Sequence, residues 1–199
     1  MSGQTVVLDP TGSKASAFQK LAPRLRTLNG ARIGFLCNRK PNADILLDQV
    51  ATRLAERFVL GARTHLTKHT PTGPASPEIY DQLQHADLVI VALNDCGGCA
   101  GWSVHDAIEL ERRGVPTVSF VTDHYVALSS AQARTQGIKS LPMVRLQHFF
   151  GQVSADEARS RTDELIDQLV QLAIADDATG NGSQTSEASA APARALAAV

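Results

Sequence analysis

Short apolar runs alternate along the chain with segments in which apolar residues recur at helical spacing. The run at 88–93 is apolar on both faces, as is typical of a central strand in a parallel sheet. Residues 44–58 instead place Ile45, Leu46 and Val50 at the spacing of one helical face. The pattern predicts strands over 31–37, 62–66, 87–93, 116–122 and 143–146, and helices over 44–58, 77–83, 103–113, 127–136 and 154–175.

This alternation of strands and helices predicts an α/β fold: a three-layer, Rossmann- or flavodoxin-like parallel sheet with helices on both faces. If the first three strands lie in the order 2-1-3, the chain reverses direction between the strands at 31–37 and 87–93. Ligands of open α/β sheets bind at such a point, beyond the carboxyl ends of the strands. We therefore expect the loops at 37–42 and 94–101 to meet there.

Domain organisation follows from a change in composition near the C-terminus. Residues 1–175 are expected to form a single α/β domain. From position 176 onward small and polar residues dominate, and such a segment cannot bury enough surface to offset the entropy of ordering it. Residues 176–199 are therefore expected to be a disordered tail.

Charge and cysteine content narrow the classes of function. The 19 basic and 20 acidic side chains give a net charge of -1, so there is no basic excess to bind nucleic acid or an anionic membrane. No apolar run approaches the ~20 residues of a membrane span, and the N-terminus has no secretory signal pattern. The 3 cysteines are too few for a disulfide scaffold. We expect a cytoplasmic protein whose thiols are reactive or bind a metal.

The segment Cys96-Gly97-Gly98-Cys99 joins the strongest predicted strand to a helix. Two thiols at this spacing can form a disulfide, share a metal ion or simply pack as small side chains in a turn. The positive end of the following helix favours a thiolate, which is the reactive form. Ser103, with Asp106 three residues later, has the pattern of a helix N-cap. A metal would need more ligands, and Cys37, at the end of the neighbouring strand, is the third thiol that could join the pair.

Other side chains near the two loops could also take part. Lys40 could bind a carboxylate or stabilise the thiolate, and Asn42 could orient a substrate, although both also fit a simple turn around Pro41. Asp95 fits a general base or a turn residue, and His105 an acid–base group or a solvent-exposed side chain. His69, His85, His124 and His148 are interpreted as structural or exposed, but His124 and Tyr125 also follow a strand end and stay under consideration.

With these motifs in view, the chain resembles the UGSC family, named for a motif in which selenocysteine or cysteine is followed by Gly-Ser-Cys. Residues 38–43 resemble the family segment Asn-x-Lys-Pro-Asn-Ala, and residues 8–12 its N-terminal leader. The resemblance covers roughly residues 6–148, and this chain departs from the family pattern at Asn94, Gly98 and Ala100. The matching residues around the cysteine motif are Asp95, Cys96, Gly97, Cys99, Asp106, Ala107, Glu111, Gly114, Pro116 and Thr117.

More distantly, the motif is similar to that of the selenocysteine-containing component of glycine, sarcosine and betaine reductases. The resemblance implies that Cys96 is the nucleophile and Cys99 its resolving or redox partner. Asp95 and His105 complete the expected catalytic set. The residues expected to bind substrate are Asn38, Lys40, Asn42, Gly97, Gly98 and Ser103.

The expected function is that of a thiol-dependent enzyme, an oxidoreductase acting on a small molecule and served by an external thiol reductant. Two alternatives stay open: a lyase or hydrolase that uses a cysteine nucleophile without redox change, and a non-catalytic metal- or redox-responsive subunit. No bound cofactor is expected, because Gly97, Gly98 and Gly101 do not form a dinucleotide-binding fingerprint. The sequence leaves both homo- and hetero-oligomers open.

Overall fold

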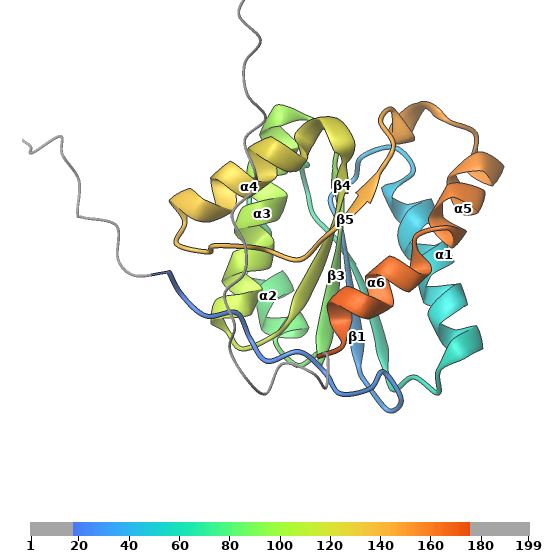
Figure 1. Ribbon diagram of the computed structural model, residues 1–199, viewed down its shortest axis with the longest axis horizontal. Coiled ribbons are helices and arrows are strands. Elements are labelled where there is room, and N and C mark those ends of the chain that lie inside the picture. Colours follow the sequence, from blue (N-terminus) through green and yellow to red (C-terminus); the bar gives the residue numbers. More distant parts are fainter. Residues whose placement is uncertain (1–17, 176–199) are drawn as a thin grey trace, which may run out of the picture.

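The computed structural model describes residues 18–175, and in this part of the chain five strands form one parallel sheet (Figure 1). The strand order is β2-β1-β3-β4-β5, which is the predicted 2-1-3 arrangement followed by two further strands. The predicted α/β class and parallel sheet are thus confirmed. The strands are β1 (Ile33–Cys37), β2 (Arg63–Thr67), β3 (Leu88–Asn94), β4 (Thr117–Thr122) and β5 (Met143–Leu146).

Helices cover both faces of the sheet and complete the three layers (Figure 1). One face packs against α1 (Ala43–Arg57), α5 (Ala155–Asp163) and α6 (Ile166–Ala173). The other face packs against α2 (Pro77–Leu83), α3 (Gly97–Arg112) and α4 (Val126–Thr135). Two short 3-10 turns, at Asp123–Tyr125 and Phe150–Gln152, follow β4 and β5.

The centre of the sheet is β3, in which every residue is buried. Ile90 and Ala92 belong to the core beneath α1, whereas Val89 and Val91 belong to the core beneath α3. This two-sided burial explains the uninterrupted apolar run, because both faces of a central parallel strand are covered. β3 pairs with β1 from Leu88, opposite Ile33, to Ala92, opposite Cys37, so the two strands end together at one edge.

Two predicted helices differ from the structure. The helix expected at 103–113 begins at Gly97, and the one expected at 154–175 is divided into α5 and α6. The buried Thr162 hydroxyl, near the end of α5, donates to the carbonyl of Ala158 (2.7 Å). Such back-bonding by threonine often bends helices, and this one lies at the point where α5 ends.

The leader resemblance at 8–12 and the tail expected at 176–199 lie outside the described residues. Within 18–175, no helix has both the length and the apolar character required to cross a membrane.

Candidate functional site

The loops after β1 and β3 meet beyond the carboxyl ends of the two strands, as predicted. Asn38, which is fully buried, donates from Nδ2 to the carbonyl of Leu93 (2.7 Å) and to Oγ of Ser103 (3.1 Å). Its Oδ1 accepts a hydrogen bond from the Lys40 amide (3.2 Å). Asn38 therefore connects both loops to α3, and its buried amide positions the site rather than facing a ligand.

The two cysteines of the second loop form the beginning of α3. Cys96 is the N-cap residue: its Sγ accepts from the Cys99 amide (3.2 Å), while Cys99 Sγ accepts from the Cys96 amide (3.0 Å). The two sulfur atoms lie 2.6 Å apart, and both residues are free cysteines. Cys96 is partly exposed and Cys99 is fully buried. An outside molecule can therefore reach Cys96, and Cys99 can be reached from Cys96.

This capping arrangement corrects the role expected for Ser103 and Asp106. Ser103 lies inside α3 and is buried, with its hydroxyl on Asn38. Asp106, also buried, accepts hydrogen bonds from Lys68 Nζ, from the Tyr80 hydroxyl (2.6 Å) and from the Ala75 amide (2.9 Å). Asp106 therefore fixes the chain between β2 and α2 against α3 instead of capping the helix.

Asp95 and Lys40 form an ion pair beside the two thiols. Lys40 Nζ lies 3.0 Å from Asp95 Oδ1, which also accepts a hydrogen bond from Cys99 Sγ (3.6 Å). Burial opposes the charge of Lys40, but the hydrogen bond from Asp95 and the nearby charges of Asp95, Cys96 and Cys99 together raise the pKa of Lys40. Lys40 is therefore a permanent cation within electrostatic range of both sulfurs.

The buried thiol of Cys99 is difficult to ionise. Burial, followed by the hydrogen bond with Cys96, raises the pKa of Cys99 to about 12. Removing its proton near neutral pH thus requires an acceptor close to Sγ, and Asp95 Oδ1 lies in such a position. The pair is asymmetric, with one accessible sulfur and one buried sulfur that retains its proton.

The segment after β5 closes the site from the other side. Asn42, with φ at 63°, donates from Nδ2 to the carbonyls of Phe150 and Val153 (3.0 Å each). A Cβ added to Gly151 would lie 3.3 Å from Asp95 Oδ2, so this segment packs directly on the ion pair. Like Asn38, Asn42 makes its hydrogen bonds within the protein.

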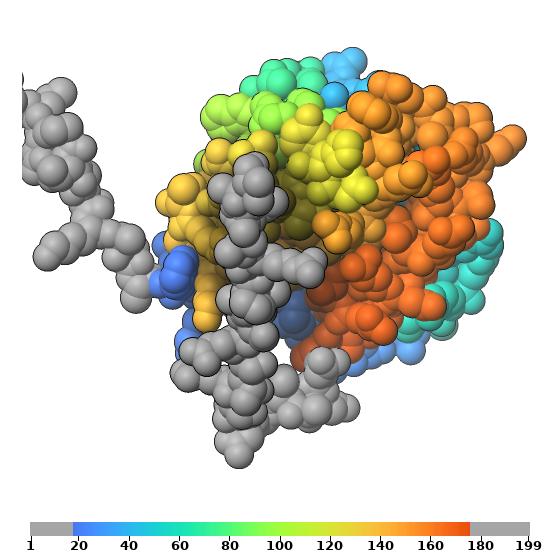
Figure 2. Space-filling view, turned by 45° about the horizontal axis from the view of Figure 1, so that its top comes forward, coloured from blue at the N-terminus to red at the C-terminus, as the bar shows by residue number. Residues whose placement is uncertain are grey.

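A cavity of about 300 Å³ lies between these segments. Lys40 and Asp95 line it together with residues that follow β4 and β5, namely Tyr125, His148 and Phe149. Figure 2 shows the yellow-green segment after β4 beside the orange segment after β5 on the face turned to the viewer. Tyr125 was under consideration from the sequence, whereas His148 was interpreted as structural or exposed. His148, like Tyr125, lies just beyond the end of a strand, and this position could have identified it from the sequence.

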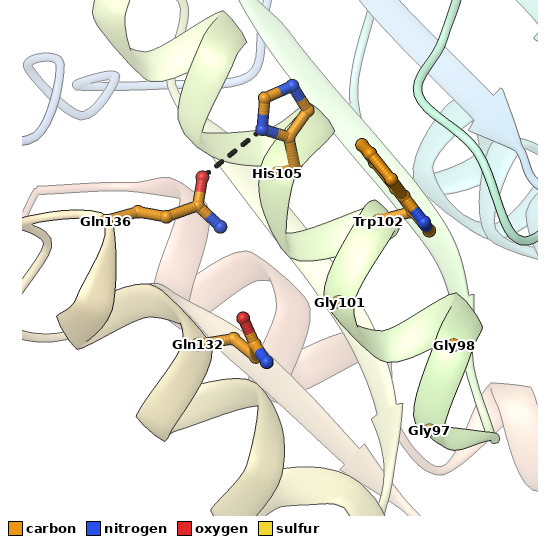
Figure 3. Close-up of a pocket in the computed structure, with 7 residues that line it drawn as sticks. All are labelled: Gly97, Gly98, Gly101, Trp102, His105, Gln132 and Gln136. Atoms are coloured by element: carbon orange, nitrogen blue, oxygen red, sulfur yellow. Dashed lines mark hydrogen bonds between the residues drawn. The ribbon is translucent and has the colours of Figure 1, made fainter. Parts of the chain in front are cut away.

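His105 lies away from the thiols, in a second cavity between α3 and α4. It is nine positions beyond Cys96, roughly 13 Å along the helix axis. Its Nδ1 lies 3.3 Å from Oε1 of Gln136, the C-cap residue of α4 (Figure 3). This cavity of about 420 Å³ also has Gly97, Gly98 and Trp102 in its wall. The structure thus separates His105, Gly97 and Gly98 from the cavity beside Asp95.

Gly98, which departs from the family motif, is close to Thr72. A Cβ at position 98 would lie 3.2 Å from Cγ2 of Thr72, which is closer than ordinary van der Waals contact. A serine at position 98 would therefore require the exposed Thr72 side chain to shift by a few tenths of an ångström. Thr72 belongs to the loop between β2 and α2, and the close approach of this loop favours glycine at position 98.

The structure changes the set of residues that could hold a metal ion. Within 18–175, the ligand atoms of Asp95, Cys96 and Cys99 lie within 4.8 Å of one another, and Cys37 is not part of this cluster. Cys37 Sγ instead accepts from the Arg39 amide (3.4 Å), and burial raises the pKa of Cys37. The expected three-thiol set is corrected to two thiols and one carboxylate.

Fold and site together define a class: an α/β protein with flavodoxin-like strand order that presents a dithiol at a helix N-terminus, at the switch point of its sheet. The sequence profile of the UGSC family matches residues 6–175. The chain belongs to the UGSC family, as the cysteine motif suggested. No curated protein matches the chain in sequence.

Solved structures similar to this chain include a flavodoxin-like domain, a diflavin flavoprotein and a short-chain flavodoxin. A flavodoxin-like domain from Synechococcus sp. is 12% identical over 71% of this chain and 99% of its own, with a TM-score of 0.38. The diflavin flavoprotein A3 from Nostoc sp. is 13% identical over 71% of this chain and 92% of its own, with a TM-score of 0.42. A short-chain flavodoxin associated with a non-canonical PDU bacterial microcompartment is 11% identical over 73% of this chain and 99% of its own, with a TM-score of 0.39.

Proposed function

We propose that this protein is a two-cysteine reductase of a small molecule, with Cys96 as nucleophile and Cys99 as resolving thiol. The observation that carries the proposal is the 2.6 Å approach of the two sulfurs at the N-terminus of α3, one accessible and one buried. The positive end of a helix stabilises negative charge on a capping sulfur, and a thiolate is the attacking species in thiol exchange.

The reaction is a two-electron reduction of a bond X–Y in the substrate. The Cys96 thiolate attacks X and forms an S–X bond, and Y leaves with the electron pair and takes up a proton. Cys99 then attacks Cys96 Sγ, the S–X bond breaks, and X leaves with its electron pair and a proton. The products are X–H, Y–H and the Cys96–Cys99 disulfide.

Two groups near the sulfurs support the second step. Asp95 Oδ1, 3.6 Å from Cys99 Sγ, is placed to accept the proton that Cys99 must lose. The Lys40 ammonium, 3.0 Å from Asp95, forms an ion pair with that carboxylate before the proton is transferred. An external dithiol reduces the disulfide and completes the cycle, which accords with the expected cytoplasmic location, where thiols are kept reduced.

The test uses single-cysteine variants and mass spectrometry. On treatment with a small disulfide, C99S is expected to accumulate a mixed disulfide at Cys96, because the resolving thiol is missing. The wild type is expected to form the Cys96–Cys99 disulfide, and C96S to stay unmodified at Cys99. C37S, which alters a thiol outside the cluster, is the matched control and is expected to behave as the wild type. If C99S turns over a substrate as fast as the wild type, the chemistry is non-redox, as in a lyase or hydrolase, and the proposal fails.

A second candidate, favoured by the compact cluster of Asp95, Cys96 and Cys99, is a metal-responsive subunit. Two thiolates and a carboxylate leave one position open in a tetrahedral zinc site. Anaerobic titration with Co²⁺ distinguishes this function. A sulfur-to-cobalt charge-transfer band that is lost in both C96S and C99S, but kept in C37S, would support it.

A further inference from the structure

The group that protonates the departing atom is not supplied by the cysteine loop. Asp95 is paired with Lys40, and His105 lies in the other cavity. The cavity beside Asp95 does contain one side chain suited to proton transfer at neutral pH, the imidazole of His148. It enters this cavity from the segment after β5.

The backbone and ring of His148 are held in place by residues at the end of β4. The His148 amide donates to Oδ1 of Asp123 (3.2 Å). The His148 ring lies beside those of Phe149 (3.9 Å between centroids), His124 (4.4 Å) and Tyr125 (5.5 Å). These contacts restrict the rotation of the imidazole, as a proton-transfer group requires.

A hydrogen-bond chain decides which ring nitrogen carries the proton. The Thr122 hydroxyl donates its only hydrogen to the carbonyl of Asn94 (3.3 Å). Thr122 Oγ1 lies 3.1 Å from Nδ1 of His148, so this oxygen is left to accept a hydrogen bond from Nδ1–H. In the neutral ring Nε2 is then the unprotonated nitrogen, and it has no hydrogen-bond partner among the described residues. The arrangement is that of an acid–base histidine oriented by a second group.

The charges of the cavity indicate the class of substrate. Among its lining residues, one ammonium and one carboxylate, those of Lys40 and Asp95, neutralise each other. Phe149, with 55% of its surface exposed, and Tyr125 add apolar area to a volume of about 300 Å³. Such a cavity suits a small uncharged molecule rather than an anion or a cation.

We infer that His148 is a catalytic acid–base residue of this site, which protonates the group that leaves an uncharged small substrate when Cys96 attacks. The inference rests on the proposed function. When Cys96 takes X, the electron pair of the X–Y bond goes to Y, and the Nε2 proton of the imidazolium goes to Y as well. The neutral His148 then recovers a proton from solvent, which balances the step.

The experiment compares two disulfide probes that differ in the leaving group. Bis(hydroxyethyl) disulfide releases a basic alkylthiolate that needs a proton on sulfur, whereas dipyridyl disulfide releases a pyridinethiolate that is stabilised by its ring and takes its proton on nitrogen, so its departure needs no acid at sulfur. With H148Q, reduction of the first probe is expected to slow by roughly tenfold or more, and reduction of the second to stay within about twofold of wild type. H85Q, which alters an exposed histidine at the opposite end of β3 from the site, is the matched control and is expected to reduce both probes at the wild-type rate.

The outcomes separate the two hypotheses. If wild type reduces neither probe through Cys96, the proposed function fails. If wild type reduces both and H148Q slows them equally, or slows neither, the assignment of His148 fails while the cysteine chemistry stands.

A second variant and the pH dependence of the rate distinguish a catalytic role of His148 from a loss of folding in H148Q. T122V removes the oxygen that orients Nδ1 and is expected to reproduce the probe-dependent loss in weaker form. With bis(hydroxyethyl) disulfide, the fall in the wild-type rate at alkaline pH is expected to disappear in H148Q and to persist in H85Q. If the rate of H148Q falls at alkaline pH as it does in the wild type, the assignment of His148 as the proton donor is wrong. The titratable side chains around His148 are Asp123, His124, Tyr125, Lys40 and Asp95.

Discussion

Replacing Asp106 by asparagine should strongly destabilise the protein, because it leaves a buried ammonium without its partner. The side chains of Lys68 and Asp106 are both fully buried. In D106N, Oδ1 can still accept from the Tyr80 hydroxyl and from the Ala75 amide, whose distances in the wild type are 2.6 and 2.9 Å. The loss is therefore confined to the charge facing Lys68, where an amide NH₂ now opposes the ammonium.

The magnitude of this loss follows from two independent considerations. Removing one partner of a buried ion pair costs about 3–5 kcal/mol. A lysine can escape such a site by losing its proton, and from an ordinary value of ~10.4 this costs about 4.6 kcal/mol at pH 7, which sets a ceiling. We therefore expect D106N to lose between about 3 and about 4.6 kcal/mol of unfolding free energy.

Urea denaturation of the full chain at pH 7 measures this loss. The double variant K68M/D106N removes both charges and should recover more than half of it, because an apolar replacement of a buried pair is often nearly neutral. Y80F removes a single neutral hydrogen bond and should cost only about 1 kcal/mol. A D106N protein within about 1 kcal/mol of wild type, or a double variant as unstable as D106N, would refute the reasoning.

Three further predictions concern local packing and charge. G98S should lower the melting temperature slightly, since the new Cβ would lie 3.2 Å from the Thr72 methyl, and T72S, which lacks that methyl, should reverse the effect. N42A removes two hydrogen bonds at a residue with φ at 63° and should cost about 2 kcal/mol in urea denaturation. The hydrogen bond from Arg53 lowers the pKa of Asp163, so the pair stabilises the fold above the ordinary carboxyl value of ~3.9 and this contribution is lost as the pH falls through the lower, folded value. D163N should therefore lose less stability than wild type between about pH 5 and pH 3, measured by thermal melts.

The fold was predictable because its signals are local. The apolar run that became β3 and the helical spacing over α1 identify strands and helices within a few residues. The rule that connections between parallel strands are right-handed and short restricts the strand order, and the order 2-1-3 entered the prediction as a condition. The meeting of the two loops at the switch point follows from that order alone.

The start of α3 was missed because cysteine is not among the residues that usually cap helices. Ser103 and Asp106 carry the usual capping pattern, but their side chains serve tertiary contacts instead. The partners of Asp106 lie 26 to 38 positions away in the chain, so no local pattern reveals them. A buried aspartate that accepts three hydrogen bonds can only be recognised once the fold brings its donors together.

The candidate site was predictable only as far as its residues are neighbours in sequence. Asp95, Cys96 and Cys99 form one loop, and their proximity follows from spacing. His148 reaches the same region through the fold, since the segment after β5 lies against Asp95. Its identification required the order of β3, β4 and β5.

The sulfur that caps α3 is also the sulfur proposed to react, so each chemical state of Cys96 changes how the first turn of the helix is held. A thiolate is a strong acceptor for the Cys99 amide, whereas a sulfur bonded to another atom is a weak one. Losing a cap costs a helix about 1 kcal/mol. The oxidised protein should therefore show faster hydrogen exchange at the amides of residues 97–100 than the reduced one. The helix terminus would act as a built-in reporter of redox state that a reductase, or any other partner, could sense without touching the sulfurs.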